Sequence, residues 1–225
     1  MNRKQIYRLL LFTGILYLAA ASANAQIIKG EIIAGFNLSQ LDGDEVYGYK
    51  KAGLQLGLGA MIPISEKWDI SLETLYNEKG ANEKAQYPMQ ADSTTGAYRV
   101  KLNYLDVPLL LHFTDKEFIT VGTGFSWGRL IKAEEFEHGK QTNTTAQNGV
   151  YNLNDFNVLL DLRMRLHKQF KINFRYQYSI SKIREREFIT SQGNIWSRKQ
   201  YNNMLTLRLV YVFNEERSQQ NLRNP

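Results

Sequence analysis

Hydrophobic and polar residues alternate along most of this chain after residue 26, with apolar side chains at every second position of each run. The segment 118–129 shows the pattern most clearly. Its bulky side chains fall on one face: Ile119, Val121, Thr123, Phe125 and Trp127. The other face carries small or polar residues. A period of two predicts a β-strand with two different faces. Because no run shows the 3.6-residue stripe of a helix, we predict an all-β fold.

Eight segments follow this pattern. We expect strands at 31–38, 53–62, 68–77, 99–113, 118–129, 156–167, 170–181 and 205–213. The connections at 63–67, 114–117 and 167–169 are short, whereas those at 40–51, 80–98, 132–151 and 185–200 are long and polar. Short turns at one end and long loops at the other are typical of outer-membrane barrels. We therefore predict an eight-stranded antiparallel up-and-down transmembrane β-barrel with both termini on the periplasmic, short-turn side.

In such a barrel the apolar face of each strand meets lipid, because a charge facing mid-bilayer costs about 2–4 kcal/mol. This turns one set of charged side chains inward: Glu31, Glu73, Asp161, Lys101, Arg163, Arg165, Lys171, Arg175 and Arg208. The same reasoning places Val100, Leu102 and Tyr104 against lipid. Eight strands enclose little more than side chains, so we expect an ion-pair network that fills the lumen. The alternative is a narrow path for protons or small solutes, with a slight preference for anions because basic residues are in excess.

Aromatic residues gather where the expected strands end. One group lies near the short turns: Trp68, Phe113, Phe118, Phe170 and Phe213. The other group lies nearer the long loops: Tyr76, Tyr104, Trp127, Phe156, Tyr178 and Tyr201. Two such groups predict aromatic girdles at the two membrane interfaces. Pro108 lies within an expected strand and lacks an amide hydrogen, so we expect a β-bulge there.

The amino terminus has the features of a secretory signal peptide. Basic residues up to Arg8 precede an apolar run from Leu9 to Ala21, and Ala23 and Ala25 form an A-x-A cleavage pattern. We therefore divide the chain into a signal peptide at 1–25, an outer-membrane barrel at 26–213 and a polar periplasmic tail at 214–225. Export and a barrel together predict the bacterial outer membrane as the location.

Composition limits the chemistry further. The chain has 225 residues, a formal net charge of +6 and no cysteine, which excludes a disulfide framework and a thiolate metal site. The basic residues are scattered rather than gathered in one stripe, and this argues against nucleic-acid binding. His112, His138 and His167 lie on separate segments without the spacing of metal ligands. We expect no metal and no cofactor.

Residues 124–128 match G-x-S-x-G, the pattern around the nucleophile of many hydrolases. That mechanism needs a strand-to-helix turn that exposes Ser126, whereas the strand alternation runs straight through the motif. We favour a structural role, in which these small residues leave room inside the barrel for long side chains. A membrane-embedded hydrolase is the less favoured alternative.

The segment 104–111 (YLDVPLLL), the glycine-rich strand after it, the signal peptide and the eight-strand rhythm resemble the Bacteroidetes outer-membrane β-barrel proteins related to PorT. The resemblance covers nearly the whole mature chain. It implies an outer-membrane barrel and, through PorT, an accessory role in type IX secretion. The polar tail after Phe213 departs from the terminal aromatic residue that is common in outer-membrane barrels.

A narrow barrel without catalytic residues is expected to act through its loops. These hold aromatic residues among polar ones: Tyr87, Tyr98, Phe136, Tyr151, Phe188 and Trp196. Exposed aromatics often anchor protein contacts. Besides membrane lipid, we therefore expect another envelope protein as partner, in type IX secretion or a nutrient-uptake assembly, and no enzymatic activity. The alternatives are that these aromatics pack on one another over the barrel mouth, and that the barrel is a narrow channel for small solutes or ions.

Overall fold

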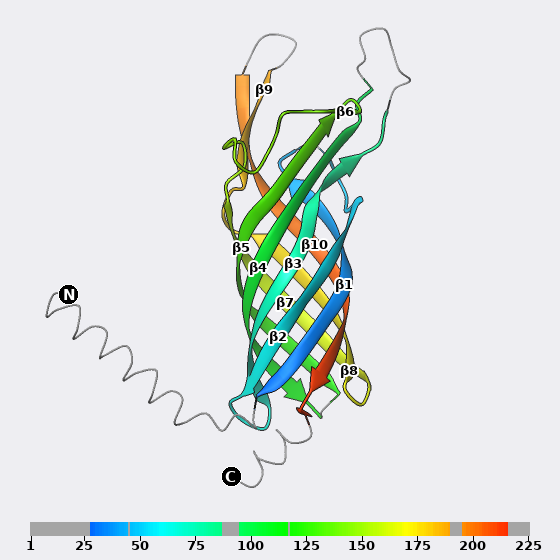
Figure 1. Ribbon diagram of the computed structural model, residues 1–225, viewed down its shortest axis with the longest axis vertical. Coiled ribbons are helices and arrows are strands. Elements are labelled where there is room, and N and C mark those ends of the chain that lie inside the picture. The colour runs from blue at the N-terminus through cyan, green and yellow to red at the C-terminus, as the bar shows by residue number, and fades with distance from the viewer. Residues whose placement is uncertain (1–27, 45, 87–94, 117, 190–194, 216–225) are drawn as a thin grey trace, which may run out of the picture.

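The computed structural model describes residues 28–44, 46–86, 95–116, 118–189 and 195–215. Its strands form a closed antiparallel ring, which Figure 1 shows as a barrel with tilted strands. Eight strands make up the ring in the order β1, β2, β3, β4, β5, β7, β8 and β10, and β10 closes it by pairing with β1. The predicted eight-stranded barrel is confirmed. None of the described segments is a helix with the length and hydrophobicity to cross a membrane.

The ring strands are long. They are β1 (Lys29–Asp42), β2 (Lys51–Pro63), β3 (Trp68–Glu83), β4 (Tyr98–Asp115), β5 (Ile119–Glu137), β7 (Asn154–His167), β8 (Phe170–Ser179) and β10 (Ile195–Phe213). Two short strands add to them: β6 (Lys140–Gln141) pairs with β5, and β9 (Arg184–Ile189) pairs with the start of β10. A strand needs about 9–11 residues to cross a bilayer. Strands β5 and β10, with 19 residues each, therefore continue beyond the membrane.

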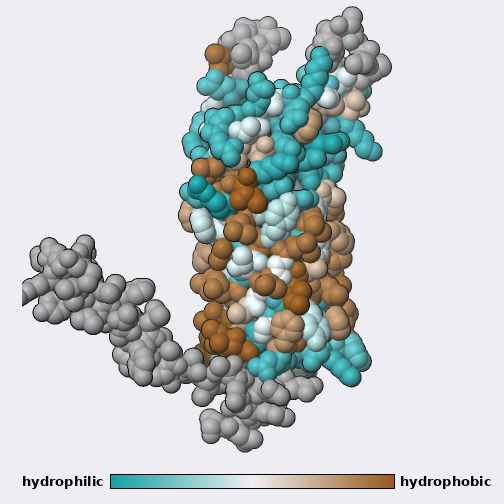
Figure 2. Space-filling model, viewed as in Figure 1, coloured by the Kyte–Doolittle hydropathy of each residue, from teal (hydrophilic) through white to brown (hydrophobic). Residues whose placement is uncertain are grey.

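Outward and inward side chains differ in polarity, as the alternation predicts. Outward side chains in the lower part of the barrel form the brown, apolar band of Figure 2. Leu58 of β2 and Phe125 of β5 are outward apolar residues with exposed fractions of 63 % and 67 %. Because the ring has no open edge, its backbone amides and carbonyls can pair with one another, as a bilayer requires.

Aromatic side chains border the apolar band at both ends. Near the short turns Trp68 packs on Phe113, with ring centroids 5.1 Å apart, and near the long loops Tyr178 stacks on Tyr201 at 6.3 Å. Tyr104 was expected in the second group, but it points inward and is 0 % exposed. We call the barrel between these two borders the membrane section.

Turns and loops lie at opposite ends of the barrel. The connections β2–β3, β4–β5 and β7–β8 are short, and β1 begins and β10 ends at the same end as these turns. Lys116 and Lys168 adopt positive φ angles of 48° and 44°, which tight turns often require. The long connections lie at the other end. One of them differs from expectation, because residues 185–189 and 195–200 pair as strands β9 and β10 instead of forming a loop.

Beyond the membrane section, at the long-loop end, the strands enclose an apolar core. We call this part of the barrel, with the connections packed on it, the loop lobe. Its buried apolar residues are Leu41, Ala81, Val100, Leu102, Tyr104, Leu130, Ala133, Ala146, Tyr151 and Ile183. Its surface is polar and appears teal above the brown band in Figure 2. The lobe therefore has the polarity of a water-soluble protein.

Strand β4 corrects the predicted orientation of residues 99–104. Val100 and Leu102 point into the lobe and are 0 % exposed, whereas Lys101 points outward with 43 % of its side chain exposed. The prediction assigned these faces the other way round because it assumed that lipid surrounds the whole strand. At this height the outside of β4 is water, so the apolar residues face inward.

The irregularity expected at Pro108 lies elsewhere. Pro108 pairs with Ser126 on β5, and the register toward β3 is the same on both sides of it. The missing amide hydrogen therefore interrupts the ladder without inserting a residue. The bulge lies in β5 instead. Asn103 pairs with Lys132 and Tyr104 pairs with Leu130, so Ile131 has no partner on β4.

Candidate functional site

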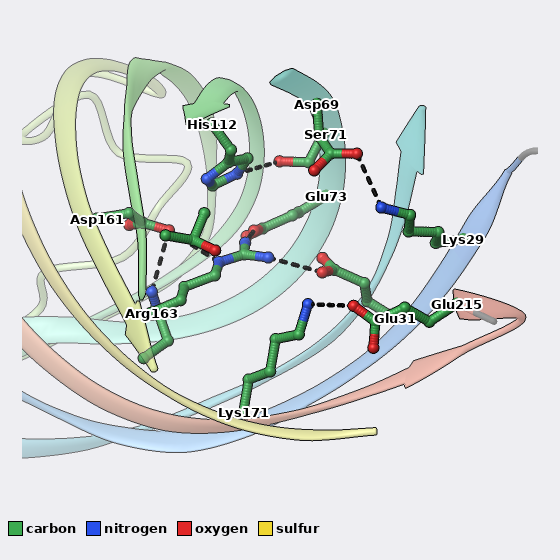
Figure 3. A network of polar contacts seen from close by, with 12 residues as sticks. Lys29, Glu31, Asp69, Ser71, Glu73, His112, Asp161, Arg163, Lys171 and Glu215 are labelled. Carbon is green, nitrogen blue, oxygen red and sulfur yellow. Dashed lines mark hydrogen bonds and ion pairs between the residues drawn. The ribbon is translucent and has the colours of Figure 1, made fainter. Parts of the chain in front are cut away.

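Charged side chains from opposite walls meet inside the membrane section. Arg163 on β7 donates to Glu31 on β1 (Nη1–Oε1, 2.6 Å) and to Glu73 on β3 (Nη2–Oε1, 2.8 Å). All three residues are at most 1 % exposed. Because β7 lies across the ring from β1 and β3, these ion pairs cross the lumen, as Figure 3 shows.

Two further arginines converge on Glu73 and on a third carboxylate, Asp161 of β7. Arg175 on β8 donates to Glu73 (2.9 Å) and to Asp161 (2.5 Å), and Arg208 on β10 donates to Glu73 (2.9 Å) and to Asp161 (3.2 Å). We call the six residues the lumen cluster: Glu31, Glu73, Asp161, Arg163, Arg175 and Arg208. Three carboxylates balance three guanidiniums. A buried charge without a partner costs several kcal/mol, so the members of such a cluster stabilise the fold only together.

Small residues make room for these long side chains. A β-carbon at Gly59 would lie 2.9 Å from the Glu31 carboxylate, and one at Gly122 would collide with the His112 ring. Glycine at inward positions of β2 and β5 is therefore a packing requirement. Within the G-x-S-x-G motif, a β-carbon at Gly128 would collide with the Asp106 carboxylate, which supports a structural role for its small residues.

Ion pairs also fill the lumen at the short-turn end. Glu215, two residues beyond the end of β10, accepts from Lys171 (2.7 Å) and Arg165 (3.0 Å) and is 4 % exposed. Lys29 pairs with Asp69 at 3.0 Å. Figure 3 shows the Lys171–Glu215 and Lys29–Asp69 pairs beside the lumen cluster. The start of the tail therefore folds back into the barrel.

A third group lies between the lumen cluster and the loop lobe. The Lys79 ammonium is 3.1 Å from both Asp106 and Asp155, and all three residues are 0 % exposed. The same ammonium lies 4.5 Å from the centre of the Tyr104 ring. Asn202 also donates to Asp155, at 2.8 Å. This group joins the polar interior to the apolar core above it.

Charges in the described part of the lumen balance. The cationic side chains are Lys29, Lys79, Arg163, Arg165, Lys171, Arg175 and Arg208, and the carboxylates are Glu31, Asp69, Glu73, Asp106, Asp155, Asp161 and Glu215. The predicted basic excess is wrong for these residues. Lys101 is the one member of the predicted interior set that lies outside the ring. Asp106 and Asp155 occupy inward strand positions that the alternation could have revealed, whereas Glu215 lies beyond the last strand and leaves no such signal.

A buried carboxylate, Glu135, connects the segments of the loop lobe. It accepts hydrogen bonds from Arg184 of β9 (2.8 Å), Tyr98 of β4 (3.0 Å) and Thr144 of the β6–β7 connection (3.0 Å). Arg184 also donates to the Tyr151 hydroxyl at 3.0 Å. Burial raises the pKa of Tyr151 to about 12 and also raises the pKa of Tyr98. Both phenols therefore keep their protons at neutral pH.

The loop aromatics fall into two groups. Tyr151 is 2 % exposed and Tyr98 is half-buried, so both help to build the lobe, which corrects their expected role as surface contacts. Tyr87 and the side chain of Phe188 lie outside the described residues.

The second group lies at the surface of the lobe. Phe136 is half-buried on β5 and Trp196 is half-buried near the tip of the β9–β10 hairpin. The Arg198 guanidinium lies over the Trp196 ring, 4.3 Å from its centre. Tyr47, which was not among the expected loop aromatics, is 78 % exposed in the β1–β2 connection. Loop residues have no periodicity, so no pattern in the sequence distinguishes an exposed aromatic here.

The hydrolase motif lacks a catalytic geometry. Ser126 lies inside the ring, within β5, and is 3 % exposed. Ser71 and His112 do share a hydrogen bond of 2.8 Å, but both are 0 % exposed beside the lumen cluster (Figure 3). Within the described ranges there is no group of three or more side chains able to hold a metal ion.

A closed ring with an apolar belt, a polar interior and long connections at one end can be compared with known proteins. Residues 25–185 match the family described as outer membrane protein beta-barrel domain. The chain belongs to this family. It is therefore a β-barrel protein of the bacterial outer membrane, as the sequence predicted. No curated protein matches the chain in sequence.

Solved structures of other outer-membrane proteins resemble this family member in fold. Ail, the attachment invasion locus protein of Yersinia pestis, gives a TM-score of 0.51 at 15 % identity, over 82 % of this chain and 98 % of Ail. Its complex with the heparin analogue sucrose octasulfate gives 0.50 at 16 % identity, over 83 % and 99 %. Neisserial surface protein A gives 0.47 at 10 % identity, over 81 % and 96 %. At these identities the likeness is one of fold.

Proposed function

We propose that this protein is a closed, non-enzymatic outer-membrane barrel that binds another envelope protein through its loop lobe. The observation that carries the proposal is the combination of a lumen crossed by buried ion pairs with an ordered lobe above it. The ion pairs argue against transport through the barrel. The ordered lobe favours an activity at its surface.

The lumen cluster supports a barrel that does not transport. Arg163, Arg175 and Arg208 are among the largest fully buried side chains, and each bridges to carboxylates on other strands. Leaving a buried charge without its partner costs about 3–5 kcal/mol, so rearranging these side chains to open a path is unfavourable. A channel for small solutes or ions is the alternative. Planar bilayers containing the wild-type protein should show no steady ion conductance.

The same burial argues against catalysis. Ser126, Ser71 and His112 are all at most 3 % exposed, and a substrate would have to displace the surrounding ion pairs to reach them. We infer that these residues fill space and satisfy hydrogen bonds inside the barrel.

The loop lobe supports binding at a prearranged surface. Its apolar core and the Glu135 hydrogen bonds hold β9, β4 and the β6–β7 connection together before any partner arrives. Order in the free state lowers the entropy cost of association. Tyr47, Phe136 and Trp196 are aromatic residues at the surface of this lobe, and aromatics are frequent anchors of protein contacts.

We infer that the loop lobe faces the outside of the cell, because long loops are extracellular and short turns periplasmic in bacterial outer-membrane barrels. The chain has no cysteine, so single cysteines can test the orientation. Lys140→Cys should react with an impermeant maleimide on intact cells, and Lys116→Cys only after lysis. The reverse pattern would invert the proposed orientation.

The partner class rests on the resemblance to PorT-related proteins. It makes a component of type IX secretion the first candidate and a component of a nutrient-uptake assembly the second. Both are large envelope assemblies in which a small closed barrel can serve as an accessory subunit.

Crosslinking and affinity purification from the native envelope test the proposal. The double variant Phe136→Ala/Trp196→Ala should lower the yield of a co-purifying protein by about tenfold or more, as expected for loss of an aromatic anchor. Trp68→Ala/Phe118→Ala removes the same residue types at the opposite end and should leave the yield unchanged. Recovery of the wild-type barrel alone would contradict a protein partner.

A further inference from the structure

Basic side chains concentrate on one outer wall, directly beyond the membrane section at the long-loop end. Arg99 and Lys101 point outward from β4, and Arg129 and Lys132 point outward from β5. Arg99, Arg129 and Lys132 are exposed, and 43 % of the Lys101 side chain is exposed. We call these four residues the basic wall.

Strand register gives the height of each cation. Arg129 pairs with Leu105, the last outward apolar residue of β4 before the basic wall begins, and Lys132 pairs with Asn103. Lys101 and Arg99 follow at the next two outward positions. Each residue adds about 3.3 Å along a tilted strand, and the polar headgroup layer is about 5–7 Å thick on each side of a bilayer. Arg129 and Lys132 therefore lie at headgroup height, and Lys101 and Arg99 lie just above it.

Charges on the basic wall are incompletely neutralised. Lys132 pairs with Glu134 at 2.9 Å, and Lys101 is 4.0 Å from the same carboxylate. Arg129 donates to a neutral amide, that of Asn154, at 3.1 Å. Glu78 of β3, a second outward carboxylate at this height, pairs in register with Asn103 and accepts from the Leu54 amide and the Tyr76 hydroxyl. Four cations therefore face two carboxylates, and the described contact of Arg129 is with a neutral group.

The opposite wall differs at the same height. There the outward residues of β8, β10 and β1 are Gln40, Asp42, Tyr178, Tyr201 and Asn203. They include no cation and one carboxylate, and the exposed Lys199 of β10 follows at the next outward position after Tyr201. General attraction to an anionic membrane surface would favour a collar of basic residues around the whole barrel. The concentration of four cations on β4 and β5, against one on the opposite wall, indicates one discrete anionic ligand instead.

A hollow of about 520 Å³ lies directly above the basic wall. Its lining includes Asn82, Glu83, Lys84, Tyr98, Arg99 and Phe136. Phe136 is the β5 partner of Arg99, and Asn82 is its β3 partner. Amide, carboxylate and guanidinium groups beside an aromatic ring can hydrogen-bond to and pack against a sugar. The hollow and the basic wall therefore share Arg99 and form one continuous surface.

We propose that this surface binds a phosphorylated glycolipid of the outer leaflet. Its phosphate lies against Arg129, Lys132 and Lys101, where guanidinium and ammonium groups form charge-assisted hydrogen bonds with phosphate oxygens. Its sugar extends toward Arg99 and Phe136. The acyl chains lie on the apolar band below. This surface shares Phe136 with the one proposed to bind the protein partner, and the inference rests on that proposal for the leaflet. The variants below keep Phe136, so the two proposals fail independently.

Nanodiscs test the inference with the full mature protein. One set contains phosphatidylcholine alone, a second adds diphosphoryl lipid A, and a third adds dephosphorylated lipid A. The wild type should melt several degrees higher with diphosphoryl lipid A than in either other set, and native mass spectrometry should show one retained lipid A. Both leaflets carry the added lipid, so the result does not depend on orientation.

Matched variants locate the site. Lys101→Ala/Arg129→Ala/Lys132→Ala should lose the lipid A-dependent rise in melting temperature and lower the retained lipid at least tenfold. Lys140→Ala/Lys182→Ala/Lys199→Ala removes three other exposed cations of the loop lobe and should keep both signals. Heat-modifiable gel migration of each variant reports an intact barrel.

Three results would overturn the inference. One is an equal gain from dephosphorylated lipid A, which would exclude phosphate recognition. The second is retention of the effect in the basic-wall variant. The third is an equal rise from inorganic phosphate in phosphatidylcholine nanodiscs, which would indicate a general anion site rather than a lipid site.

Discussion

The membrane section and the loop lobe are built from the same strands but have opposite polarity. In the membrane section Leu105 of β4 faces outward and Asp106 faces inward; four residues earlier, in the lobe, Lys101 faces outward and Leu102 inward. The strand alternates without a break, so the same side of β4 faces the interior throughout. What changes is the medium outside, from lipid to water. A single ring therefore contains a barrel with a charged interior joined to a small domain with an apolar core.

The two interiors are stabilised by different interactions. Removing one apolar side chain from the lobe leaves a cavity, whereas removing one charge from the lumen leaves its partners buried and unpaired. A single substitution in the lumen should therefore lower stability more than one in the lobe, and it should destabilise the whole barrel. A substitution in the lobe should cause local unfolding, because opening the lobe exposes only its own apolar core.

The largest expected effect is at Glu73. It accepts from Arg163, Arg175 and Arg208, so Glu73→Gln should lower the free energy of unfolding by about 3–5 kcal/mol or prevent assembly. Urea unfolding in lipid vesicles and heat-modifiable migration measure this. Glu78→Gln, on the outer face of the same strand, is the control and should cost less than about 1 kcal/mol. Equal stability of the two variants would mean that the lumen does not depend on the cluster.

The next effect distinguishes the lobe core from the lipid face. Leu102→Ala should create a cavity and cost about 2–5 kcal/mol of lobe stability. Leu109→Ala on the same strand faces lipid and leaves no enclosed cavity, so its effect should be smaller. Hydrogen exchange should show faster opening of the lobe in the first variant, with the membrane section still protected. Loss of protection throughout the barrel would show that the two regions unfold as one unit.

Exchanging polarity at two outward positions of β4 tests where the medium outside the barrel changes from lipid to water. Leu109→Arg puts a charge into lipid and should cost about 2–4 kcal/mol, while Lys101→Leu, in water, should change stability by less than about 0.5 kcal/mol. Unfolding in vesicles compares the two. If Lys101→Leu were strongly stabilising, the apolar band would extend higher than the upper aromatic border.

The last effect is a pH dependence confined to the lobe. Burial of Asp44 in the β1–β2 connection raises its pKa to about 7, above its value in the unfolded chain. Protonation thus favours the folded lobe: this contribution is complete below about pH 4 and is lost as the pH rises to about 7, by at most about 1.4 kcal/mol per pH unit. Melting of the lobe between pH 5 and 8 should show this slope. It should disappear in Asp44→Asn and remain in Asp115→Asn, a change at the opposite end.

The sequence alone determined the number of ring strands, the alternation along them, and the separation of short turns from long connections, because strand periodicity and turn composition are local properties. It also identified Glu31, Glu73, Asp161, Arg163 and Arg175 as inward residues. Where lipid surrounds the barrel, the hydrophobicity of a residue reliably indicates whether its side chain points outward or inward. The same reasoning failed at Val100, Leu102 and Tyr104, because a period of two distinguishes two faces of a strand without revealing which medium each face meets.

Only the tertiary structure decided which charges meet. Arg163 and Glu31 are separated by 132 positions in the sequence and are joined because ring closure brings β7 across from β1. Glu215 enters the lumen only because the chain turns back after β10, beyond the last residue with a periodic signal. The basic wall likewise requires β4 and β5 to lie side by side in one register, so that four scattered cations become one surface. These features depend on distances across the barrel, which alternation along a single strand does not encode.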